Sequence, residues 1–477
     1  MSSSAATSSQ VAAPASAGDS AGALSRIRGA AGLRTLPLGL LACVALAALT
    51  LLAPSAPTYD PWAWIVWGRE ILHLELSTTG GPSWKPLPVA FTTVFALFGS
   101  AAPTLWVLVA RAGAFYGVLA AFRLGRRLGG VPAGAAGAAG LLLAPWYIRN
   151  GALGNSEGLQ VAFALAAIER HLAGKRRVAF ALALGLGMLR PEAWAFVGLY
   201  GLWLLWTDRR SIWLVAVGLA SLPVLWLAPE KWGSDDWLRA AHRAQQPVGN
   251  SAAFSSNPTV EVLRDGAAML TPPVWAGLAL LALLAIRARD RAIAVLVVVA
   301  GGWVLLVAVM TANGYSGNQR YLIVPAALLI VLAAVGAGRA VALLHPRTTL
   351  AVAALTVVLV AAFAIPPMNR LERVINGTTY QARLIDELGP LVKSAGGAPE
   401  LRACGHAYSG AYLVPAVAWH LNVHTIQVGF QPAGPPAVVF RSQTTRSSSP
   451  VPPLGDDLAS AHTIAFGERW RIVGACR

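Results

Sequence analysis

The residues of this chain that could do chemistry are charged side chains placed at the ends of apolar segments. Asp60 follows the first apolar segment, in TYDPWAW, and Glu157 begins another, in GNSEGL. Lys85 stands between a tryptophan and a proline, in SWKPLP. A charge at membrane depth costs about 2.5–3.5 kcal/mol on insertion scales, so these residues are functional candidates. A carboxylate can deprotonate a hydroxyl nucleophile, and a lysine can bind a phosphate as a point charge.

Further candidates lie at similar positions later in the chain. Arg190 and Glu192 interrupt an apolar stretch in LRPEAW, and Arg320 and Tyr321 open another in NQRYLIVP. Arg111 lies inside an apolar segment and must face protein or a water-filled cavity. Arginine binds phosphate with two parallel hydrogen bonds, and cations stabilise a departing phosphate. Carboxylates beside such cations suit the transfer of a sugar from a lipid phosphate.

Each candidate also has a simpler structural explanation. Asp60, followed by proline, can cap a helix, and Lys85 can extend to lipid headgroups as an anchor. Glu157 can favour the N-terminal end of a helix dipole. Arg190 and Glu192 can form an ion pair that holds a hairpin, and the loop at Arg320 can be a polar loop with an interfacial Tyr321. The tryptophans that follow Asp60 are typical of an interfacial aromatic belt.

The composition decides which kind of protein must position these residues. The chain has 477 residues, of which 56% are hydrophobic and only 12% charged, whereas soluble domains carry about 25% charged residues. Its apolar blocks of about 15–22 residues match a bilayer. We therefore predict a polytopic α-helical membrane protein, with the lipid bilayer as its environment.

Several functional classes are excluded by the same reading. The net charge of +16 comes from basic residues at the ends of apolar blocks, as the positive-inside rule expects, so no nucleic-acid partner is predicted. The sequence has neither an HExxH zinc motif nor a Walker phosphate-binding loop.

Length and flanking charge predict about eleven transmembrane helices. They lie near 36–53, 104–122, 133–148, 158–172, 178–189, 193–206, 211–228, 273–286, 292–311, 321–341 and 350–365. The run 87–99 is too short to span and is predicted as an interfacial or re-entrant helix. The charge bias places the N-terminus in the cytoplasm. The expected location is the bacterial plasma membrane. The candidate residues outside the spans then share the outer face.

Three regions are expected along the chain. Residues 1–33 form a disordered cytoplasmic tail, 34–365 the transmembrane domain, and 366–477 a small exoplasmic α/β domain. In the last region we predict an amphipathic helix at 380–393. Short strands are expected at LRACG, HTIQV, AVVFR, HTIAF and WRIVGAC.

Cys404 and Cys476 lie near the two ends of this exoplasmic region, in an oxidising compartment. A disulfide between them would stabilise the region by roughly 4 kcal/mol in the chain-entropy model. The alternative is two unrelated strand cysteines.

Together these motifs resemble the GT-C class of integral-membrane glycosyltransferases, which use polyprenyl-phosphate sugars on the outer face. The resemblance covers roughly 36–341 and rests on the acid of the first outer loop, WKPLP, ARAGAFYG, RLGRRLGG, LRPEAW and QRYLIVP. RPE and the separate C-terminal module are similar to cell-wall arabinofuranosyltransferases, and QRYLIVP to the mannosyl and lipid A branch.

The resemblance implies a role for each candidate. Asp60 would be the catalytic base, and Glu157 a second acid that positions the acceptor. Together the two acids could hold a divalent metal (Mg²⁺, Mn²⁺ or Ca²⁺) through oxygen ligands. Lys85 and Arg320 would bind the donor phosphate. The sequence departs from the class pattern of adjacent acids, because Tyr59 precedes Asp60 and Pro61 follows it.

The predicted function is therefore transfer of a sugar from a polyprenyl-phosphate donor to a cell-envelope glycan or lipid. Arg190, Glu192 and Tyr321, with Arg111, are expected to line the substrate site. Two alternatives stay open at this point. One is a polytopic transporter or lipid flippase, because intramembrane charges and broken helices fit that class too. The other is a non-catalytic protein that binds a glycolipid.

Overall fold

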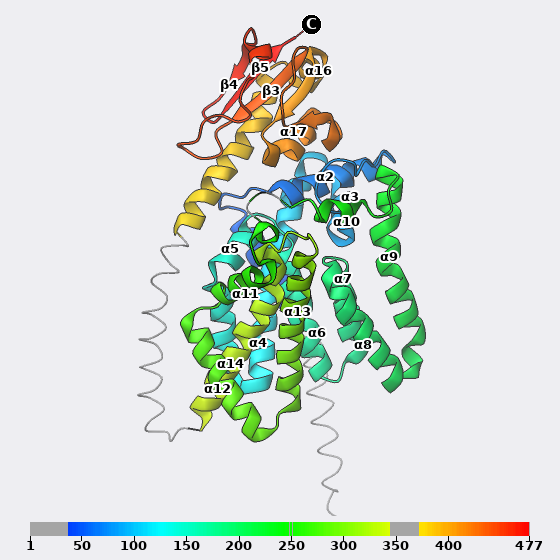
Figure 1. The fold of residues 1–477 in the computed structure, drawn as a ribbon, viewed down its shortest axis with the longest axis vertical. Helices are drawn as coiled ribbons and strands as arrows, with labels where there is room; N and C mark the ends of the chain where they lie inside the picture. Colours follow the sequence, from blue (N-terminus) through cyan, green and yellow to red (C-terminus); the bar gives the residue numbers. More distant parts are fainter. Residues whose placement is uncertain (1–36, 248, 250, 344–371, 477) are drawn as a thin grey trace, which may run out of the picture.

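The computed structural model describes residues 37–343, apart from 248 and 250, and residues 372–476 (Figure 1). It is mostly helical, with a small C-terminal sheet. Four helices are long and apolar enough to cross a membrane: Gly99–Leu142, Arg209–Ser234, Arg291–Ala312 and Gln319–Ala342. The helices α11 (Pro258–Ala268) and α12 (Pro272–Ala288) meet at 96° and would make a fifth span if counted together.

The predicted number of about eleven spans is not reproduced in the described residues. The helices α6 (Glu157–Leu172), α7 (Arg176–Gly187) and α8 (Trp194–Thr207) form where spans are predicted, but contain 16, 12 and 14 residues. At 1.5 Å per residue these are about 18–24 Å long, which is less than the roughly 30 Å hydrocarbon core. The predicted span 350–365 and the predicted tail 1–33 lie outside the described residues.

The long helix α4 (Ala102–Leu142) is a hairpin of two arms. Its backbone is non-helical at the turn, where Gly130 has φ 83°. A Cβ atom on Gly134 would lie 2.6 Å from the carbonyl oxygen of Phe122, on the other side of the turn. The two arms therefore pack closely, and they follow the predicted spans 104–122 and 133–148.

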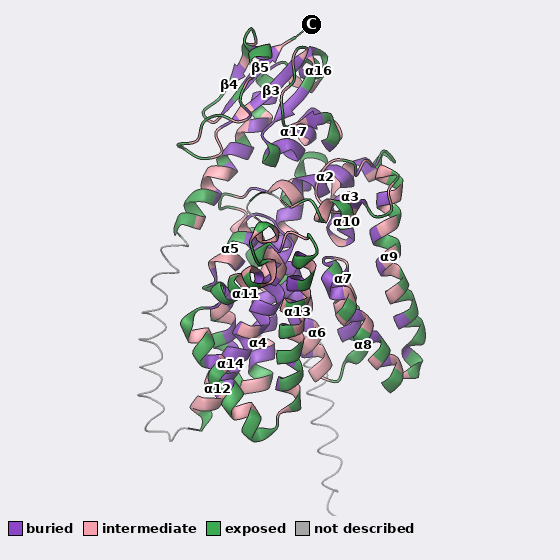
Figure 2. Ribbon diagram, in the orientation of Figure 1, coloured by how far each residue is buried: buried purple, intermediate pink, exposed green. Residues whose placement is uncertain are grey.

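The centre of the bundle is α14 (Ile323–Ala342), which packs against α4 and α12. Of its most apolar stretch, 83% is buried, whereas α9 (Ile212–Ser234) has 28% buried at the edge of the bundle. Figure 2 shows the buried residues gathered on α4 and α14. The bundle also contains α5 (Pro145–Ala152) and α13 (Arg291–Ala312).

A layer of short helices lies between the bundle and the C-terminal module (Figure 1). It consists of α2 (Tyr59–Leu72), α3 (Pro86–Ala96) and α10 (Arg239–Ala244). The helix α3 forms where the interfacial or re-entrant segment 87–99 is predicted. Thr92 of α3 donates its hydroxyl proton to the carbonyl oxygen of Trp64 in α2, at 2.6 Å.

The tryptophans of α2 correct the predicted aromatic belt, because all three are buried in protein. Trp64 packs edge-on against Trp106, and Trp67 packs against Trp84. Trp62 contacts Trp419 of the C-terminal module. These side chains fix α2, and with it Asp60, between the bundle and the module.

The C-terminal module joins helices to a five-stranded sheet of order β2-β1-β3-β5-β4. Its elements are a helix at 372–394, α16 (Gly397–Cys404), β1 (His406–Ser409), α17 (Val414–Leu421), β2 (Val428–Gly429), β3 (Ala437–Ser442), β4 (His462–Phe466) and β5 (Trp470–Ala475). The strand β1 runs parallel to β2 and β3, and β5 runs antiparallel to β3 and β4.

Three of the five predicted strands form as expected, at AVVFR, HTIAF and WRIVGAC. The prediction for LRACG is wrong, because this segment ends α16, where Leu401 and Cys404 are buried and Arg402 is exposed. The three-residue spacing of the buried side chains is that of a helix. A segment of five residues is too short to show this periodicity in the sequence. HTIQV is mostly a 3₁₀ turn, and only its last residue enters β2.

Cys404 and Cys476 form a disulfide across a sequence separation of 72 residues. The bond joins the end of α16 to the segment that follows β5. It therefore closes most of the module into one covalent loop.

The module contacts the membrane-side layer through α17 and α2. Arg69 of α2 donates hydrogen bonds to the carbonyl oxygens of Trp419, at 3.2 Å, and Val423, at 2.7 Å. Its guanidinium also lies 5.3 Å from the Trp419 ring centre. Glu70 contacts His424 at 2.9 Å. The helix that carries Asp60 is thus held by the module at its other end.

We expect Arg69→Ala to loosen this contact. Hydrogen bonds from a charged group contribute about 1.5–3 kcal/mol each, so amide hydrogen exchange in α17 should accelerate about tenfold or more. His73→Ala, an exposed change on the same helix end, is the matched control. Equal exchange rates in α17 for Arg69→Ala and the unchanged protein would contradict this contact.

Candidate active site

Asp60 lies in the first turn of α2, at the end of the bundle nearest the module. The helix begins after Thr58, whose hydroxyl donates to the side-chain oxygen of Asn155 at 2.8 Å. Asp60 is not the N-cap residue, which is Thr58, and lies inside the first turn. Instead its Oδ2 accepts from Arg320 Nη1 at 3.1 Å, and 21% of the side chain is exposed. Asp60 therefore pairs with Arg320 and does not cap the helix.

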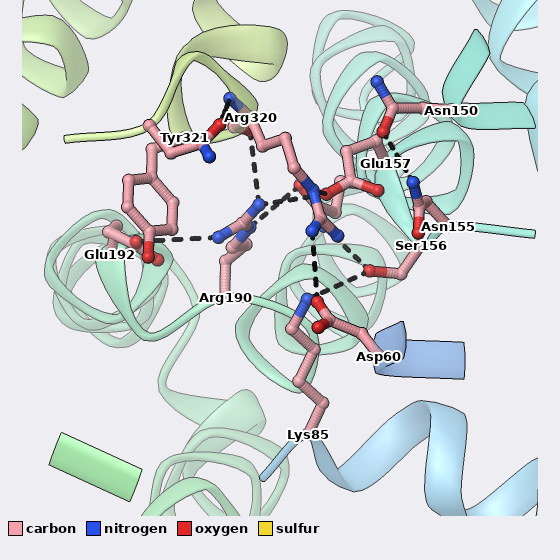
Figure 3. A network of polar contacts seen from close by, with 12 residues as sticks. Asp60, Lys85, Asn150, Asn155, Ser156, Glu157, Arg190, Glu192, Arg320 and Tyr321 are labelled. Carbon is pink, nitrogen blue, oxygen red and sulfur yellow. Dashed lines mark hydrogen bonds and ion pairs between the residues drawn. The ribbon is translucent and has the colours of Figure 1, made fainter. Parts of the chain in front are cut away.

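Glu157 is the centre of the site. Its Oε1 accepts from Arg320 Nε at 2.7 Å and from Arg190 Nη2 at 3.1 Å, and the side chain is fully buried. Figure 3 shows the two guanidinium groups converging on this carboxylate. Burying an unpaired carboxylate would cost several kcal/mol, so the two arginines are what permit Glu157 at this position.

Lys85 lies beside this pair, at the residue that precedes α3. Its Nζ is 3.3 Å from the Ser156 hydroxyl and 5.0 Å from the Trp64 ring centre. The side chain is buried, so it does not extend to lipid headgroups. Burial, and then the positive charge of Arg190, lower the pKa of Lys85 to about 7.

Arg190 connects the remaining predicted residues. Its guanidinium lies 4.6 Å from the Tyr321 ring centre, and its Nη2 also donates to the Arg320 carbonyl oxygen at 3.2 Å. Glu192 Oε1 is 4.0 Å from Arg190 Nη1, so the predicted ion pair exists but is longer than the pair with Glu157.

Gln160 is a member of the site that sequence reasoning missed. Its Oε1 accepts from Arg190 Nε at 3.1 Å, and its Nε2 donates to Ser156 at 3.0 Å. The signal was its position three residues after Glu157, which puts both side chains on one face of α6.

Arg111 lies outside this cluster. Its guanidinium donates to the carbonyl oxygens of Thr50 and Ala152. Arg111 thus ties α4 to the ends of α5 and of the helix Pro37–Thr50, and no contact in the described residues places it with the other predicted site residues.

The donor set of this site does not fit a divalent cation. Arg320 contacts both Asp60 and Glu157, so a guanidinium takes the position between the two predicted metal ligands. Within residues 37–343 and 372–476, as described, no three His, Cys, Asp or Glu side chains group as metal ligands. The divalent cation stays a prediction that these residues do not support, and no step below uses one.

Comparisons with known proteins place the chain in a known fold. No protein-family model and no curated protein matches the sequence. The crystal structure of ArnT from Cupriavidus metallidurans bound to undecaprenyl phosphate matches 91% of this chain and 97% of its own, with a TM-score of 0.54 at 14% identity. The apo structure of the same ArnT matches 93% and 98%, with a TM-score of 0.51 at 15% identity.

The chain has the GT-C fold. The resemblance drawn from the sequence motifs is therefore confirmed at the level of fold. Within the GT-C fold, the cluster around Glu157 collects side chains from α2, α6, the segment before α3, the α7–α8 connection and the entry to α14 (Figure 3). Arg320 alone contacts both predicted acids within the described cluster.

Proposed function

We propose that this protein is a membrane glycosyltransferase that moves a sugar from a polyprenyl-phosphate donor to a hydroxyl of a cell-envelope glycan or lipid. The observation that carries the proposal is the accessible carboxylate of Asp60 beside Lys85 and Arg320, at one end of a GT-C bundle (Figure 3). The ArnT structure bound to undecaprenyl phosphate supports a polyprenyl-phosphate donor. The outer face of the bacterial plasma membrane is the proposed location.

Asp60 is the proposed general base. It is the acid with exposed surface, whereas Glu157 is fully buried between two arginines. Asp60 takes the proton of the acceptor hydroxyl while that oxygen bonds to the anomeric carbon. The bond between this carbon and the phosphate oxygen breaks, and the polyprenyl phosphate leaves with the electron pair.

Lys85 and Arg320 bind the phosphate and stabilise the charge that it gains. Arg320 Nη2 is buried with no hydrogen-bond partner among the described residues, so it has a free N–H to donate. A phosphate would compete with Asp60 for Arg320. Donor binding would therefore weaken the Asp60–Arg320 pair and release the base for the acceptor.

Glu157 holds the cations in place and does not act on substrate in this proposal. Without its charge, Lys85, Arg190 and Arg320 would repel one another in a buried space. Arg190 in turn orients Glu192 and Tyr321, which face the sugar or the acceptor.

The lowered pKa of Lys85 gives a pH dependence. A solvated lysine keeps its charge to about pH 10.4, whereas Lys85, with a pKa of about 7, loses its charge above neutral pH in the free enzyme. The KM for the donor should therefore rise above pH 7, by up to tenfold per pH unit. Lys85→Arg stays charged, so its KM should be flat between pH 6.5 and 8.5. Parallel KM profiles for both proteins would remove Lys85 from phosphate binding.

The direct test is transfer by purified protein, with a panel of radiolabelled polyprenyl-phosphate sugars and a cell-envelope acceptor extract. Label that moves to the acceptor supports the proposal, and the productive donor identifies the sugar. Donor binding without transfer would favour a non-catalytic glycolipid-binding protein. If the protein neither transfers nor binds but moves lipid across vesicles, the transporter or flippase alternative replaces the proposal.

A further inference from the structure

The C-terminal module contains a polar cavity of about 210 Å³ that plays no part in the site around Glu157. Segments far apart in the sequence meet there: the helix at 372–394, the loop after β3 and the turn between β4 and β5. The lining side chains are Tyr380, Arg383, Gln443, Arg446, Glu468 and Arg469.

Arg469 is the fixed part of this cavity. Its guanidinium pairs with Glu468 at 2.7 Å and with Glu387 at 3.4 Å, and lies 5.3 Å from the Tyr380 ring centre. Only 9% of the side chain is exposed. Its Nε is buried without a hydrogen-bond partner in the described part of the chain. An N–H donor is thus held rigidly with one hydrogen bond still to make.

Arg383 and Arg446 add two further positive charges. Both are exposed, and neither has an ion pair or a side-chain hydrogen bond to any residue that the structure describes. With Arg469, they bring three positive charges to a lining that contains one carboxylate, Glu468. Glu387, which does not line the cavity, neutralises part of the charge of Arg469. The cavity therefore keeps an excess of positive charge, and unpaired guanidinium groups bind carboxylate or phosphate oxygens.

Gln443 provides an uncharged hydrogen-bonding group in the cavity lining. Tyr380 donates its hydroxyl proton to the Gln443 carbonyl oxygen at 3.0 Å, and the Gln443 backbone N–H donates to the Arg469 carbonyl oxygen at 3.0 Å. The backbone is thus held on both sides. The side-chain amide has no partner among residues 372–476 as described or in the bundle, so it can accept from and donate to hydroxyl groups.

We propose that this cavity binds an acidic saccharide, with Arg383 and Arg446 on its carboxylate or phosphate and Gln443 on its hydroxyls. The module is docked on α2, the helix that carries Asp60. These contacts are at Arg69, at the end of the helix opposite Asp60, so a glycan held in the cavity would lie on the same side of the bundle as the proposed base. That this glycan is the acceptor rests on the proposed function. That the cavity binds an acidic saccharide does not.

The test is binding of digalacturonate to the full-length protein in detergent, measured by isothermal titration at low salt, with the neutral disaccharide maltose alongside. Digalacturonate should bind, and binding should weaken at least tenfold in Arg383→Ala/Arg446→Ala and as salt is raised. Arg373→Ala/Arg402→Ala is the matched control, since it removes two exposed guanidinium groups of the module outside the cavity. Asp60→Asn should bind as the unchanged protein does, which separates this site from catalysis.

Three results would overturn the proposal. They are equal affinity in the cavity variant and the unchanged protein, equal affinity for maltose, and arginine-dependent binding only to phosphatidylglycerol vesicles. The last result would assign the cavity to a lipid headgroup. If the unchanged protein binds digalacturonate but transfers sugar from no donor, the proposed function is contradicted and the binding site is still supported.

Discussion

Asp60→Asn should lower kcat for sugar transfer by about 10²–10⁴-fold, the usual contribution of a general base. The amide keeps the shape of the carboxylate and can still accept the hydrogen bond from Arg320 Nη1, at 3.1 Å in the unchanged protein. It cannot take a proton from the acceptor. Because the neutral amide no longer attracts Arg320 by charge, the donor KM should stay the same or fall. Steady-state kinetics in which the donor and acceptor concentrations are varied independently measure kcat and the donor KM.

Asp235→Asn is the matched control for this change. Asp235 pairs with Lys231, but 90% of its side chain is exposed and it lies outside the cluster. This variant should keep the kinetics and thermal stability of the unchanged protein. If Asp60→Asn turned over normally, Asp60 would not be the base.

Glu157→Gln should impair both folding and transfer. Glu157 is the carboxylate that Arg190 and Arg320 share, and it is fully buried. Removing one partner of a buried ion pair typically destabilises a protein by about 3–5 kcal/mol, because the remaining charges lose their compensation. Denaturant unfolding in detergent measures the change in stability. The folded fraction should also bind donor more weakly, since Lys85 and Arg320 are no longer held together.

Glu261→Gln provides the comparison for a surface ion pair. Glu261 contacts Arg264 at 3.0 Å, but the arginine side chain is 72% exposed. Surface pairs contribute little, so its stability should be nearly unchanged. A Glu157→Gln protein as stable as Glu261→Gln would show that the buried charges are compensated by other groups.

The local sequence pattern was sufficient for the helices that are long and apolar enough to cross a bilayer. Apolar runs predicted the two arms of α4 as well as α9, α13 and α14, because a bilayer requires long apolar helices. Lys85, Glu157 and Arg320 stood out for the same reason, since a charge at membrane depth needs a partner. The pattern overcounted full spans, because α7 and α8 are apolar but shorter than the hydrocarbon core.

Local pattern was insufficient for the shorter apolar segments, whose packing partners lie far away in the sequence. Trp62 and Trp64 read as an interfacial belt, yet they pack against Trp419 and Trp106. The LRACG segment read as a strand, yet it is the end of α16. In each case the apolar signal was correct, but the surface that covers the residue comes from a distant part of the chain.

By itself, the sequence predicted a membrane protein with charged residues at its helix ends and a separate C-terminal module. Only the tertiary structure decided how those charges are paired. Asp60 and Arg320 are 260 residues apart and meet at 3.1 Å, and Arg111 is directed to backbone carbonyls instead. The physical reason is that helix hydrophobicity depends on neighbouring residues in the chain, whereas the partner of a buried charge depends on how helices pack.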